Sequence, residues 1–520
     1  MAEKYIWTLA IYLLALGGLA PGIASAQLNA EESLYLDEVV LGGSLTPGAE
    51  LGDVLAFGDF DGDGHDELVI GAPSRSLGSL DEAGRVFVVP GSPDGLLPGM
   101  TQTWTANATL IPGIAQEGDR LGSALAVGDF NADGTEDLAI GIPGSSVNGL
   151  AEAGRVVVLF GSATGLGAGG SEGLDQDDLL GSGPEAGDAF GSALAAGDFN
   201  DDGSSDLAIG SPSENWNGAE RAGLVQLIIG DDSGLLGNPS LFLTQGSQGV
   251  TQAGDRYGAS LAAGNFAGDS ADDLAIGSPG EDSDAGVVIL GTGTAGTLLA
   301  SIDLVASYQS DDCGFAVTPL SSFGVSLTLG NFDGDAYQDI GVGAPGSGGL
   351  PFQGIACALF GQNSAVAMRT ASLFQSPAWN DVAEENDFFG FAVAAGDFNG
   401  DGYSELAVGT PGENLLGVDF GLVTVFPGDP ATPLAATLPV DQITQDSPGI
   451  TGVGQPQDQL GRSLAVGDFN GDQVEDLAMA IPGESQGAGA VIVLPGVSPG
   501  LIFRNGFESG SLEAWSLAVP

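Results

Sequence analysis

Seven stretches of the sequence place oxygen-bearing side chains at a spacing that suits a bound metal ion. In the first, side-chain oxygens of Asp59, Asp61, Asp63 and Glu67 stand at positions 1, 3, 5 and 9, and the backbone carbonyl of His65 stands at position 7. Ca²⁺ takes about six to eight oxygen ligands, and alternate positions on a tight turn direct successive carboxylates inward. The spacing therefore predicts a calcium loop.

Six of the seven loops keep all four side-chain ligands, and we expect about six Ca²⁺ sites. The fifth and seventh loops have Ala336 and Gln473 where loops 1, 2, 3 and 6 have a glycine for the sharp turn, so we expect weaker binding there. The fourth has Ala267 at position 3, which removes a ligand, so we expect it to be metal-free or marginal. The predicted ligands are Asp59, Asp61, Asp63 and Glu67; Asp129, Asn131, Asp133 and Asp137; Asp198, Asn200, Asp202 and Asp206; Asn331, Asp333, Asp335 and Asp339; Asp397, Asn399, Asp401 and Glu405; and Asp468, Asn470, Asp472 and Asp476.

The same residues also suit turns that hold no metal, because Asp-Gly and Asn-Gly pairs are common in tight hairpins. One copy would be explained that way. Six copies at fixed spacing would crowd four or five carboxylates and amides into each loop without a neutralising cation, which favours calcium. Magnesium fits less well because it prefers to keep its bound waters.

The loops belong to a sixteen-residue phrase that occurs seven times, at 58–73, 128–143, 197–212, 264–279, 330–345, 396–411 and 467–482. Successive copies start 66 to 71 residues apart, which is long for one hairpin and suits a four-stranded sheet with its loops. Alternating apolar residues predict an inner strand before each loop, a second strand after it and a third beyond, as at 121–127, 137–142 and 154–160.

The seventh unit lacks a fourth strand of its own, and residues 33–36 resemble the fourth strands of other units in sequence and spacing. We therefore expect the N-terminal segment to complete the last unit. This closes a ring and leaves only short sheet edges. The predicted fold is all-β, a seven-bladed β-propeller of four-stranded antiparallel blades, whose core includes Phe60, Phe130, Phe199, Phe266, Phe332, Phe398 and Phe469.

The repeated phrase, as at Phe190-Gly191 followed by Gly210-Ser-Pro212, resembles the FG-GAP repeats of integrin α-subunit propellers and of their secreted bacterial relatives. The resemblance covers about residues 33–494. It implies a seven-bladed propeller with calcium in hairpins on one face and ligand recognition on the opposite face. Integrin propellers carry calcium in only some blades, whereas most loops of this sequence keep their ligands.

The amino-acid composition limits the classes of molecule that the protein can bind. The sequence has 10 Lys and Arg against 69 Asp and Glu, a net charge of −59, which excludes nucleic acid as a partner. Residues 1–26 have the pattern of a signal peptide, so we expect a secreted or cell-surface protein with no transmembrane segment in the mature chain. We assign 27–503 to the propeller and 504–520 to a C-terminal tail of unassigned role. Cys313 and Cys357 either form one disulfide or stay as two buried thiols.

We expect a non-enzymatic adhesion or ligand-binding module, with structural calcium, that recognises an unidentified extracellular protein or glycan. No catalytic residues are identified, since the only histidine, His65, lies inside a loop. The alternative is a secreted enzyme that acts on polysaccharide, because two carboxylates suffice for glycosidic cleavage. Many acids lie in variable loops and could pair, such as Glu214, Glu281, Asp282, Glu384 and Glu385. A structural component without a specific ligand is the third possibility.

Overall fold

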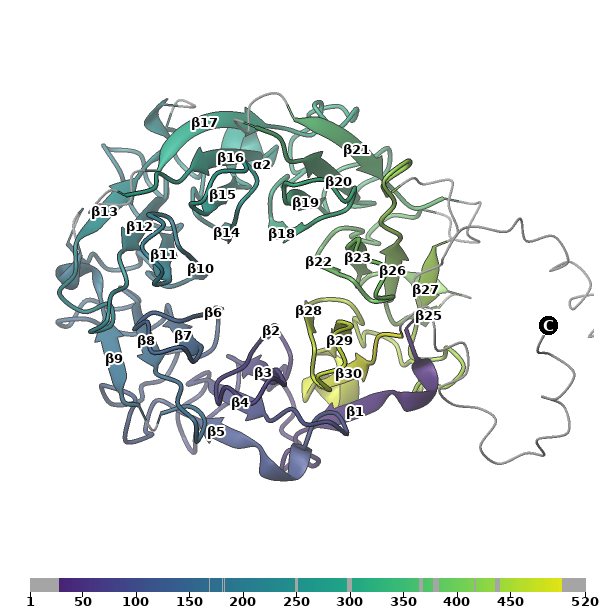
Figure 1. The fold of residues 1–520 in the computed structure, drawn as a ribbon, viewed down its shortest axis with the longest axis horizontal. Helices are drawn as coiled ribbons and strands as arrows, with labels where there is room; N and C mark the ends of the chain where they lie inside the picture. The colour runs from purple at the N-terminus through teal and green to yellow at the C-terminus, as the bar shows by residue number, and fades with distance from the viewer. Residues whose placement is uncertain are drawn as a thin grey trace, which may run out of the picture.

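The computed structural model describes residues 28–497, apart from 168, 180, 182, 248–250, 297–301, 364–367, 377–382, 416–417 and 435–439. The predicted signal peptide and C-terminal tail lie outside the described residues. Seven four-stranded antiparallel sheets surround a central axis, as Figure 1 shows, so the predicted propeller is confirmed. Among the described residues, no helix is long and apolar enough to cross a membrane.

Each sheet is one blade, and its strands follow one another from the axis outward (Figure 1). Blades 1 to 4 consist of β2 (Val54–Gly58), β3 (Glu67–Ala72), β4 (Arg85–Val89) and β5 (Gln102–Trp104); β6 (Leu125–Gly128), β7 (Asp137–Ile142), β8 (Arg155–Leu159) and β9 (Ser171–Leu174); β10 (Ala193–Gly197), β11 (Asp206–Ser211), β12 (Leu224–Ile228) and β13 (Ser240–Leu243); and β14 (Ser260–Gly264), β15 (Asp273–Ser278), β16 (Val287–Thr292) and β17 (Asp303–Tyr308).

Blades 5 to 7 consist of β18 (Ser326–Gly330), β19 (Asp339–Ala344), β20 (Ile355–Phe360) and β21 (Arg369–Leu373); β22 (Val393–Gly396), β23 (Glu405–Thr410), β26 (Leu422–Phe426) and β27 (Asp441–Ile443); and β28 (Leu464–Gly467), β29 (Asp476–Ile481), β30 (Ala490–Leu494) and β1 (Leu34–Asp37). The other elements are a small hairpin, β24 (Asn414–Leu415) with β25 (Val418–Asp419), and the single helical turns Ala30–Glu32, Pro98–Met100, Gln176–Asp178, Gln245–Ser247, α2 (Glu281–Asp284) and α3 (Glu484–Gly487).

The ring closes as the sequence predicts. β1 pairs antiparallel with β30, with Leu36 opposite Val491, and it is the outer strand of blade 7. In Figure 1 the purple β1 lies beside the yellow β30. A further bridge joins Leu28 to Gly496. The first and last strands of the described chain therefore share one sheet.

The core lies between neighbouring blades. The seven repeated phenylalanines, one per blade, are at most 1% exposed, as predicted. Each hydrophobic cluster combines residues of two adjacent blades, for example Phe469 of blade 7 with Leu68 and Phe87 of blade 1. Burial of apolar area therefore holds each blade to the next.

The two cysteines form a disulfide. Cys313, in the segment after β17, is bonded to Cys357 in β20, with their Cα atoms 6.0 Å apart. The bond joins the segment that leaves blade 4 to the third strand of blade 5. Of the two alternatives open at the sequence level, the structure shows the paired one.

Candidate metal centre

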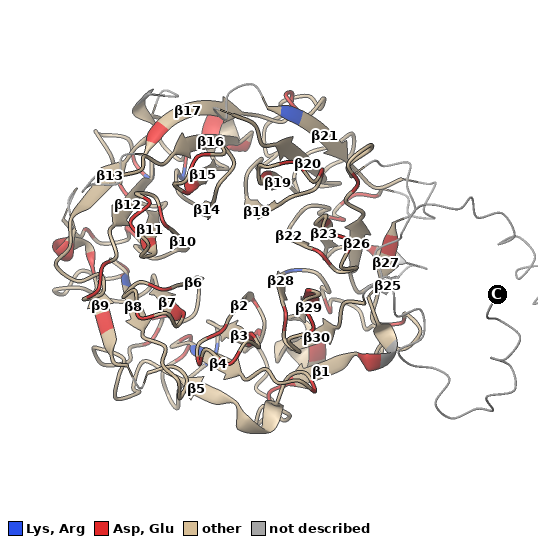
Figure 2. Ribbon diagram, in the orientation of Figure 1, with Lys and Arg blue, Asp and Glu red and all other residues tan. Residues whose placement is uncertain are grey.

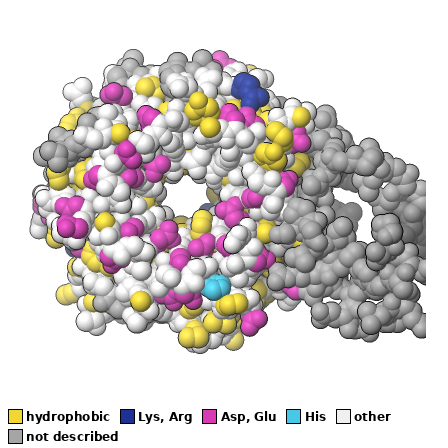
Figure 3. Space-filling view, viewed as in Figure 1, with side chains coloured by type: hydrophobic (Ala, Val, Ile, Leu, Met, Phe, Trp, Pro, Cys, Tyr) yellow, Lys and Arg dark blue, Asp and Glu magenta, His cyan; other side chains and the backbone are white. Residues whose placement is uncertain are grey.

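The acidic loops join the first and second strands of each blade, so all seven lie on one face of the ring. Figure 3 views this face, where the cyan side chain is the only histidine of the sequence, His65. Figure 2 shows acidic segments in every blade and few basic ones. The axis is open in Figure 3, and a hollow of 420 Å³ there is lined by innermost strands, including residues of β2, β6, β18, β22 and β28.

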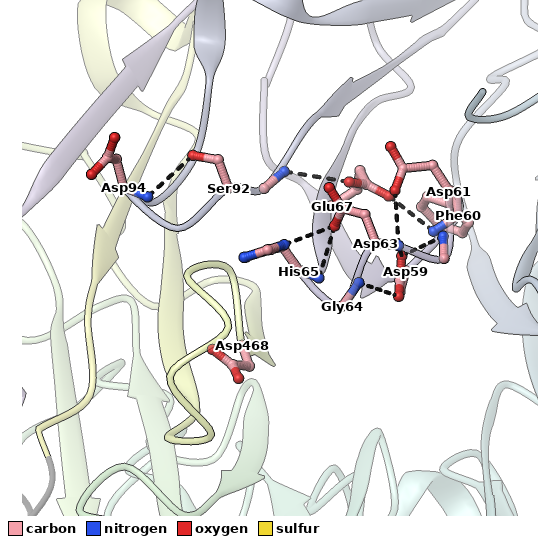
Figure 4. Close-up of polar contacts among 12 residues, drawn as sticks. Asp59, Phe60, Asp61, Asp63, Gly64, His65, Glu67, Ser92, Asp94 and Asp468 are labelled. Carbon is pink, nitrogen blue, oxygen red and sulfur yellow. Dashed lines mark hydrogen bonds and ion pairs between the residues drawn. The ribbon is translucent and has the colours of Figure 1, made fainter. Parts of the chain in front are cut away.

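In the first loop, three carboxylates converge (Figure 4). Oxygen atoms of Asp59, Asp61 and Glu67 all lie within 4.8 Å of one another. Backbone N–H groups fix Asp59, because its Oδ1 accepts from Asp63 N at 3.1 Å and its Oδ2 accepts from Gly64 N at 2.9 Å. The loop thus turns the predicted ligands at positions 1, 3 and 9 toward one point.

The ligand predicted at position 5 of this loop has a different neighbour. Asp63 Oδ1 accepts from the backbone N of His65 at 3.0 Å and lies 2.8 Å from His65 Nδ1 (Figure 4). The only histidine is therefore tied to the loop.

Position 9 holds a buried carboxylate in all seven loops. Asp137 is typical: its Oδ2 accepts from Phe130 N at 2.9 Å and its Oδ1 from Gly161 N at 2.8 Å. A Cβ at Gly161 would meet the carbonyl oxygen of Glu136 at 2.1 Å, so only glycine lets the third strand approach this closely. The seven carboxylates, all at most 5% exposed, belong to Glu67, Asp137, Asp206, Asp273, Asp339, Glu405 and Asp476.

Burial raises the pKa of these carboxyls, and the neighbouring acids add to the effect in most loops. The pKa of Glu405 rises to about 9 because of burial and the nearby Asp401, and that of Glu67 rises to about 8. Asp273 in the fourth loop rises only to about 6, because three backbone N–H groups bind its carboxylate. A loop with such a group calls for a proton or a cation at neutral pH.

The loops fall into two conformational classes. In loops 1, 2, 3, 6 and 7, position 1 is Asp and position 6 has a positive φ. The N–H at position 6 then donates to the position 1 carboxylate, as from Gly134 to Asp129 Oδ2 at 2.9 Å. Gln473 of the seventh loop adopts the same conformation, with φ 67°, and donates to Asp468 Oδ2 at 2.8 Å. The missing glycine has not changed the backbone there.

Loops 4 and 5 differ from this arrangement. Both begin with Asn, and neither Ser270 nor Ala336 at position 6 has a positive φ. The side-chain amide of Asn265 donates to the carbonyl of Asp269, and that of Asn331 donates to the carbonyl of Asp335 at 2.9 Å. In these two loops the side chain at position 1 thus donates a hydrogen bond to the loop backbone. In the other five loops the side chain at position 1 is a carboxylate, which only accepts hydrogen bonds.

The fifth loop also receives a positive charge from the protein itself. Arg369, the first residue of β21, forms an ion pair with Asp333 at position 3 of the loop. The guanidinium carbon lies 4.5 Å from the centre of the Phe360 ring, which holds the arginine over the loop. A guanidinium thus neutralises a predicted ligand.

Position 8, which the sequence analysis passed over, links each loop to the next blade. Its backbone N–H donates to the carbonyl of position 1 in the preceding blade at all seven junctions, at 2.8 to 3.4 Å. Its side chain often accepts in return, as Glu136 Oε2 does from Asp59 N at 2.7 Å and Asp66 Oδ2 from Asp468 N at 2.8 Å. The acceptors that recur there (Asp, Glu, Gln and Ser) were a visible signal in the sequence. The seven loops therefore form one hydrogen-bonded ring.

The donor set of the first class fits Ca²⁺. It consists of carboxylate and amide oxygens without nitrogen or sulfur ligands, as a hard cation prefers. In the third loop, Asn200 is 2% exposed and its Oδ1 has no hydrogen-bond partner. Such a buried acceptor is normally satisfied, so it is available as a ligand at position 3.

Comparison with known proteins finds FG-GAP repeats in five of the seven blades. The FG-GAP repeat family matches residues 51–89, 121–159, 190–228, 389–426 and 460–494. These five segments lie in blades 1, 2, 3, 6 and 7, the same blades that carry the first class of loop. The chain carries FG-GAP repeats and is homologous to integrin alpha subunits over the aligned part.

Among curated proteins, the chain is 37% identical over 176 residues to phosphatidylinositol-glycan-specific phospholipase D of Rattus norvegicus, which covers 34% of this chain and 20% of that protein. It is 32% identical over 233 residues to integrin alpha-5 of Xenopus laevis, which covers 43% and 20%. The chain thus spans about a fifth of the length of these relatives. The relatives include an enzyme as well as integrin subunits.

Among solved structures, the Dos1 propeller aligns with a TM-score of 0.45 at 12% identity, covering 89% of this chain and 95% of that chain. This likeness is too low to carry an argument about function.

Proposed function

We propose that this chain is an extracellular, non-enzymatic ligand-binding propeller whose loops hold structural calcium. The observation that carries the calcium part is the convergence of Asp59, Asp61 and Glu67 within 4.8 Å, on a backbone that four other loops repeat. Crowded carboxylates of this kind, one of them buried, are stabilised by a cation at their centre.

We assign five calcium ions, to loops 1, 2, 3, 6 and 7. Positions 1, 3, 5 and 9 supply the side-chain ligands, and position 7 supplies a carbonyl. Bound calcium would supply the positive charge that the loops lack. Each site saturated at about 100 times its dissociation constant adds roughly 2.7 kcal/mol to the free energy of unfolding. Because the loops are hydrogen-bonded into one ring, the ions stabilise the contacts between blades as well.

Ligand recognition belongs to the opposite face, by analogy with the integrin propellers. The turns there enclose a hollow of 1030 Å³ between blades 6, 7 and 1, lined by polar residues that include Glu50, Arg462 and Ser485. A second hollow, of 390 Å³, includes Arg221, Arg256 and Asp282 in its lining. Polar, open hollows of this kind suit an extracellular protein or a glycan.

The acids proposed for an enzyme do not gather in one place. Asp282 is exposed on one turn and the adjacent Glu384 and Glu385 are exposed on another, whereas Glu214 and Glu281 are buried between blades. A glycosidase needs its two carboxyls to flank the bond that is cleaved. The binding function is therefore the better supported one.

Calcium removal tests the proposal. We expect native mass spectrometry to count five ions and EDTA to lower the urea midpoint, with Asp59→Asn losing one ion and the exposed Asp94→Asn losing none. Absence of bound calcium, with no EDTA effect, would contradict the calcium part. Screening on a glycan array and a panel of extracellular proteins tests binding, and Ser485→Arg, which fills the larger hollow, should abolish it while Asp94→Arg should not.

A further inference from the structure

Away from the calcium loops, each junction between two blades has three buried positions. The first follows the outer strand of one blade, the second lies just before the first strand of the next blade, and the third follows that blade's second strand. The second and third are always 26 residues apart, as in Asp188 and Glu214. Four junctions combine Gln, Asp and Glu: Gln176, Asp188 and Glu214; Gln245, Asp255 and Glu281; Gln375, Asp387 and Glu413; and Gln445, Asp458 and Glu484. We call the Asp and Glu of each set a junction acid pair.

All members of these sets are at most 8% exposed. A backbone N–H three residues earlier binds each Asp, such as Gln252 N to Asp255 Oδ2 at 2.5 Å and Gln455 N to Asp458 Oδ2 at 2.6 Å. The Gln binds the Glu, as from Gln245 Nε2 to Glu281 Oε2 at 2.5 Å. Two carboxyl groups are thereby held in place inside the protein.

In two of the four pairs the carboxyls also contact each other, Asp188 with Glu214 and Asp255 with Glu281. Asp188 Oδ1 is buried and accepts no N–H or O–H from another group. Ionised carboxylates only accept hydrogen bonds, so a bond between two of them requires a proton on one.

We propose that each junction acid pair holds one shared proton at mildly acidic pH, forming an O–H···O bond that joins two turns of one blade beneath the glutamine of the preceding blade. The proton lowers the charge of the pair from −2 to −1. Each of the four junctions is then a fully hydrogen-bonded polar contact in the interior.

The other three junctions avoid a charge of −2 by different residues. Between blades 7 and 1, Glu38 pairs with Arg75 at 2.7 Å, and Ala49 replaces the Asp. Between blades 4 and 5 all three positions are serine, and between blades 1 and 2 Asp119 is the single acid. The four acid pairs are therefore the junctions that need an added positive charge.

A proton fits these sites better than a metal ion. N–H groups point at the carboxylates: Glu484 accepts from Gln445 Nε2 at 3.0 Å and from Ser485 N at 3.1 Å. These donors would repel a cation. Burial, with the charge of Asp255 and Asp282, raises the pKa of Glu281 to about 7, and burial with Glu484 raises that of Asp458 to about 6.

The charged groups that face the pairs are mostly acidic. Glu185 faces Asp188, and Asp282 faces the pair of blade 4, where Arg256 is paired with Asp284. Tyr35 faces the pair of blade 7. Since these neighbours are neutral or negative, they favour retention of the proton.

Infrared spectroscopy of the full chain, saturated with calcium, tests the proposal. At about pH 5 we expect the absorption of a protonated carboxyl, since this pH lies below the raised pKa of both Asp458 and Glu281. Asp255→Asn and Glu281→Gln each neutralise one member of a pair, so each should remove the part of that absorption that one pair contributes. Asp282→Asn, at the neighbouring exposed acid, should remove none.

Stability provides the second readout. The shared proton stabilises the junction below its raised pKa, and this contribution is lost as pH rises from about 5 to 8. The urea midpoint of the wild type should therefore lose more, or gain less, over this range than that of Asp255→Asn. No protonated-carboxyl absorption in the wild type would overturn the proposal. So would loss of one bound metal ion in both Asp255→Asn and Glu281→Gln. Comparison of each variant with the wild type separates the junction from the calcium loops, because the loops are the same in both.

Discussion

At the scale of single residues, the buried carboxylate at position 9 determines that a loop requires a cation or a proton. It is buried and accepts backbone N–H groups from its own loop and from the turn after the third strand, as Asp206 does from Phe199 and Gly230. These bonds fix its position, yet burial still raises its pKa to about 8. Its charge is therefore costly to the fold unless a cation or a proton accompanies it.

The first consequence is a pH dependence that calcium reverses. In EDTA, the folded-state pKa of Glu67 and Glu405 lies above the unfolded value, so their protonated forms stabilise the fold at low pH, and this stability is lost as pH rises through about 8 to 9. We expect the urea midpoint in EDTA to be higher at about pH 5 than at pH 9. With calcium the loop contribution should reverse, because protons compete with the ion.

A variant isolates this effect. Glu405→Gln should reduce the pH dependence in EDTA and lose one calcium ion, whereas Asp94→Asn, at an exposed turn, should change neither. An EDTA midpoint that rises with pH would contradict this account of position 9.

At the scale of the element, the same hairpin is built in two ways. Five hairpins begin with Asp and have a left-handed residue at position 6, whereas hairpins 4 and 5 begin with Asn and have none at that position. In the fifth, Arg369 supplies a positive charge from the outer strand of the blade. The strands on either side keep the same register in both kinds, as the pairs Gly128–Asp137 and Gly330–Asp339 show.

The fifth hairpin should therefore become a calcium loop when its differences are removed. We expect the triple variant Asn331→Asp, Ala336→Gly and Arg369→Gln to bind one calcium ion more than the wild type by native mass spectrometry. Arg462→Gln is the matched control, since Arg462 also pairs with an aspartate, Asp53, and lies over a ring, Phe391. An unchanged count in the triple variant, with the other loops loaded, would show that the hairpin lacks further requirements for binding.

How much of the fold and of the calcium loops could be predicted from the sequence depends on how far apart along the chain the interacting residues lie. Ligand spacing, the buried phenylalanines and the strand order are local or repeated, so the pattern alone predicts them. The contact of Arg369 with Asp333 joins the outer strand of blade 5 to the loop between its first two strands, and only the fold brings them together. The conformation of Gln473 also differs from expectation, since its neighbours impose a positive φ that glycine usually provides.

The interpretation of Glu214 and Glu281 depended on the same distinction. From the sequence they were candidate acids in variable loops. The structure buries both between blades, next to Asp188 and Asp255. Each glutamate follows its aspartate by 26 residues, and this spacing was visible in the sequence. The burial of both side chains, which makes them a structural pair, was not.

At the scale of the whole molecule, the ring is closed at one seam, which is the pairing of β1 with β30. β1 completes blade 7, and Leu36 is fully buried against it. Interior contacts between blades are repeated seven times, whereas this pairing of distant chain segments occurs once. The seam is also free of any disulfide, since the only one joins Cys313 to Cys357 within the described residues.

Weakening the seam should weaken the whole ring. We expect Leu36→Ala to lower the free energy of unfolding by about 2 to 5 kcal/mol, because it leaves a cavity under β1. Leu45→Ala, at a residue 43% exposed, should change it by less than about 0.5 kcal/mol. Urea denaturation measures both, and limited proteolysis should cut the N-terminal segment faster in Leu36→Ala. Equal stability of the two variants would show that the ring holds without this strand.

The seam also means that the ring can close only after the last blade has been synthesised. A growing chain presents β1 early, but β1 has no partner until β30 has been synthesised, after every intervening blade. A product that stops short leaves one strand edge exposed at each end and is open to proteases and to pairing with other chains. A complete chain can therefore close the ring and protect its strand edges, whereas a truncated chain cannot.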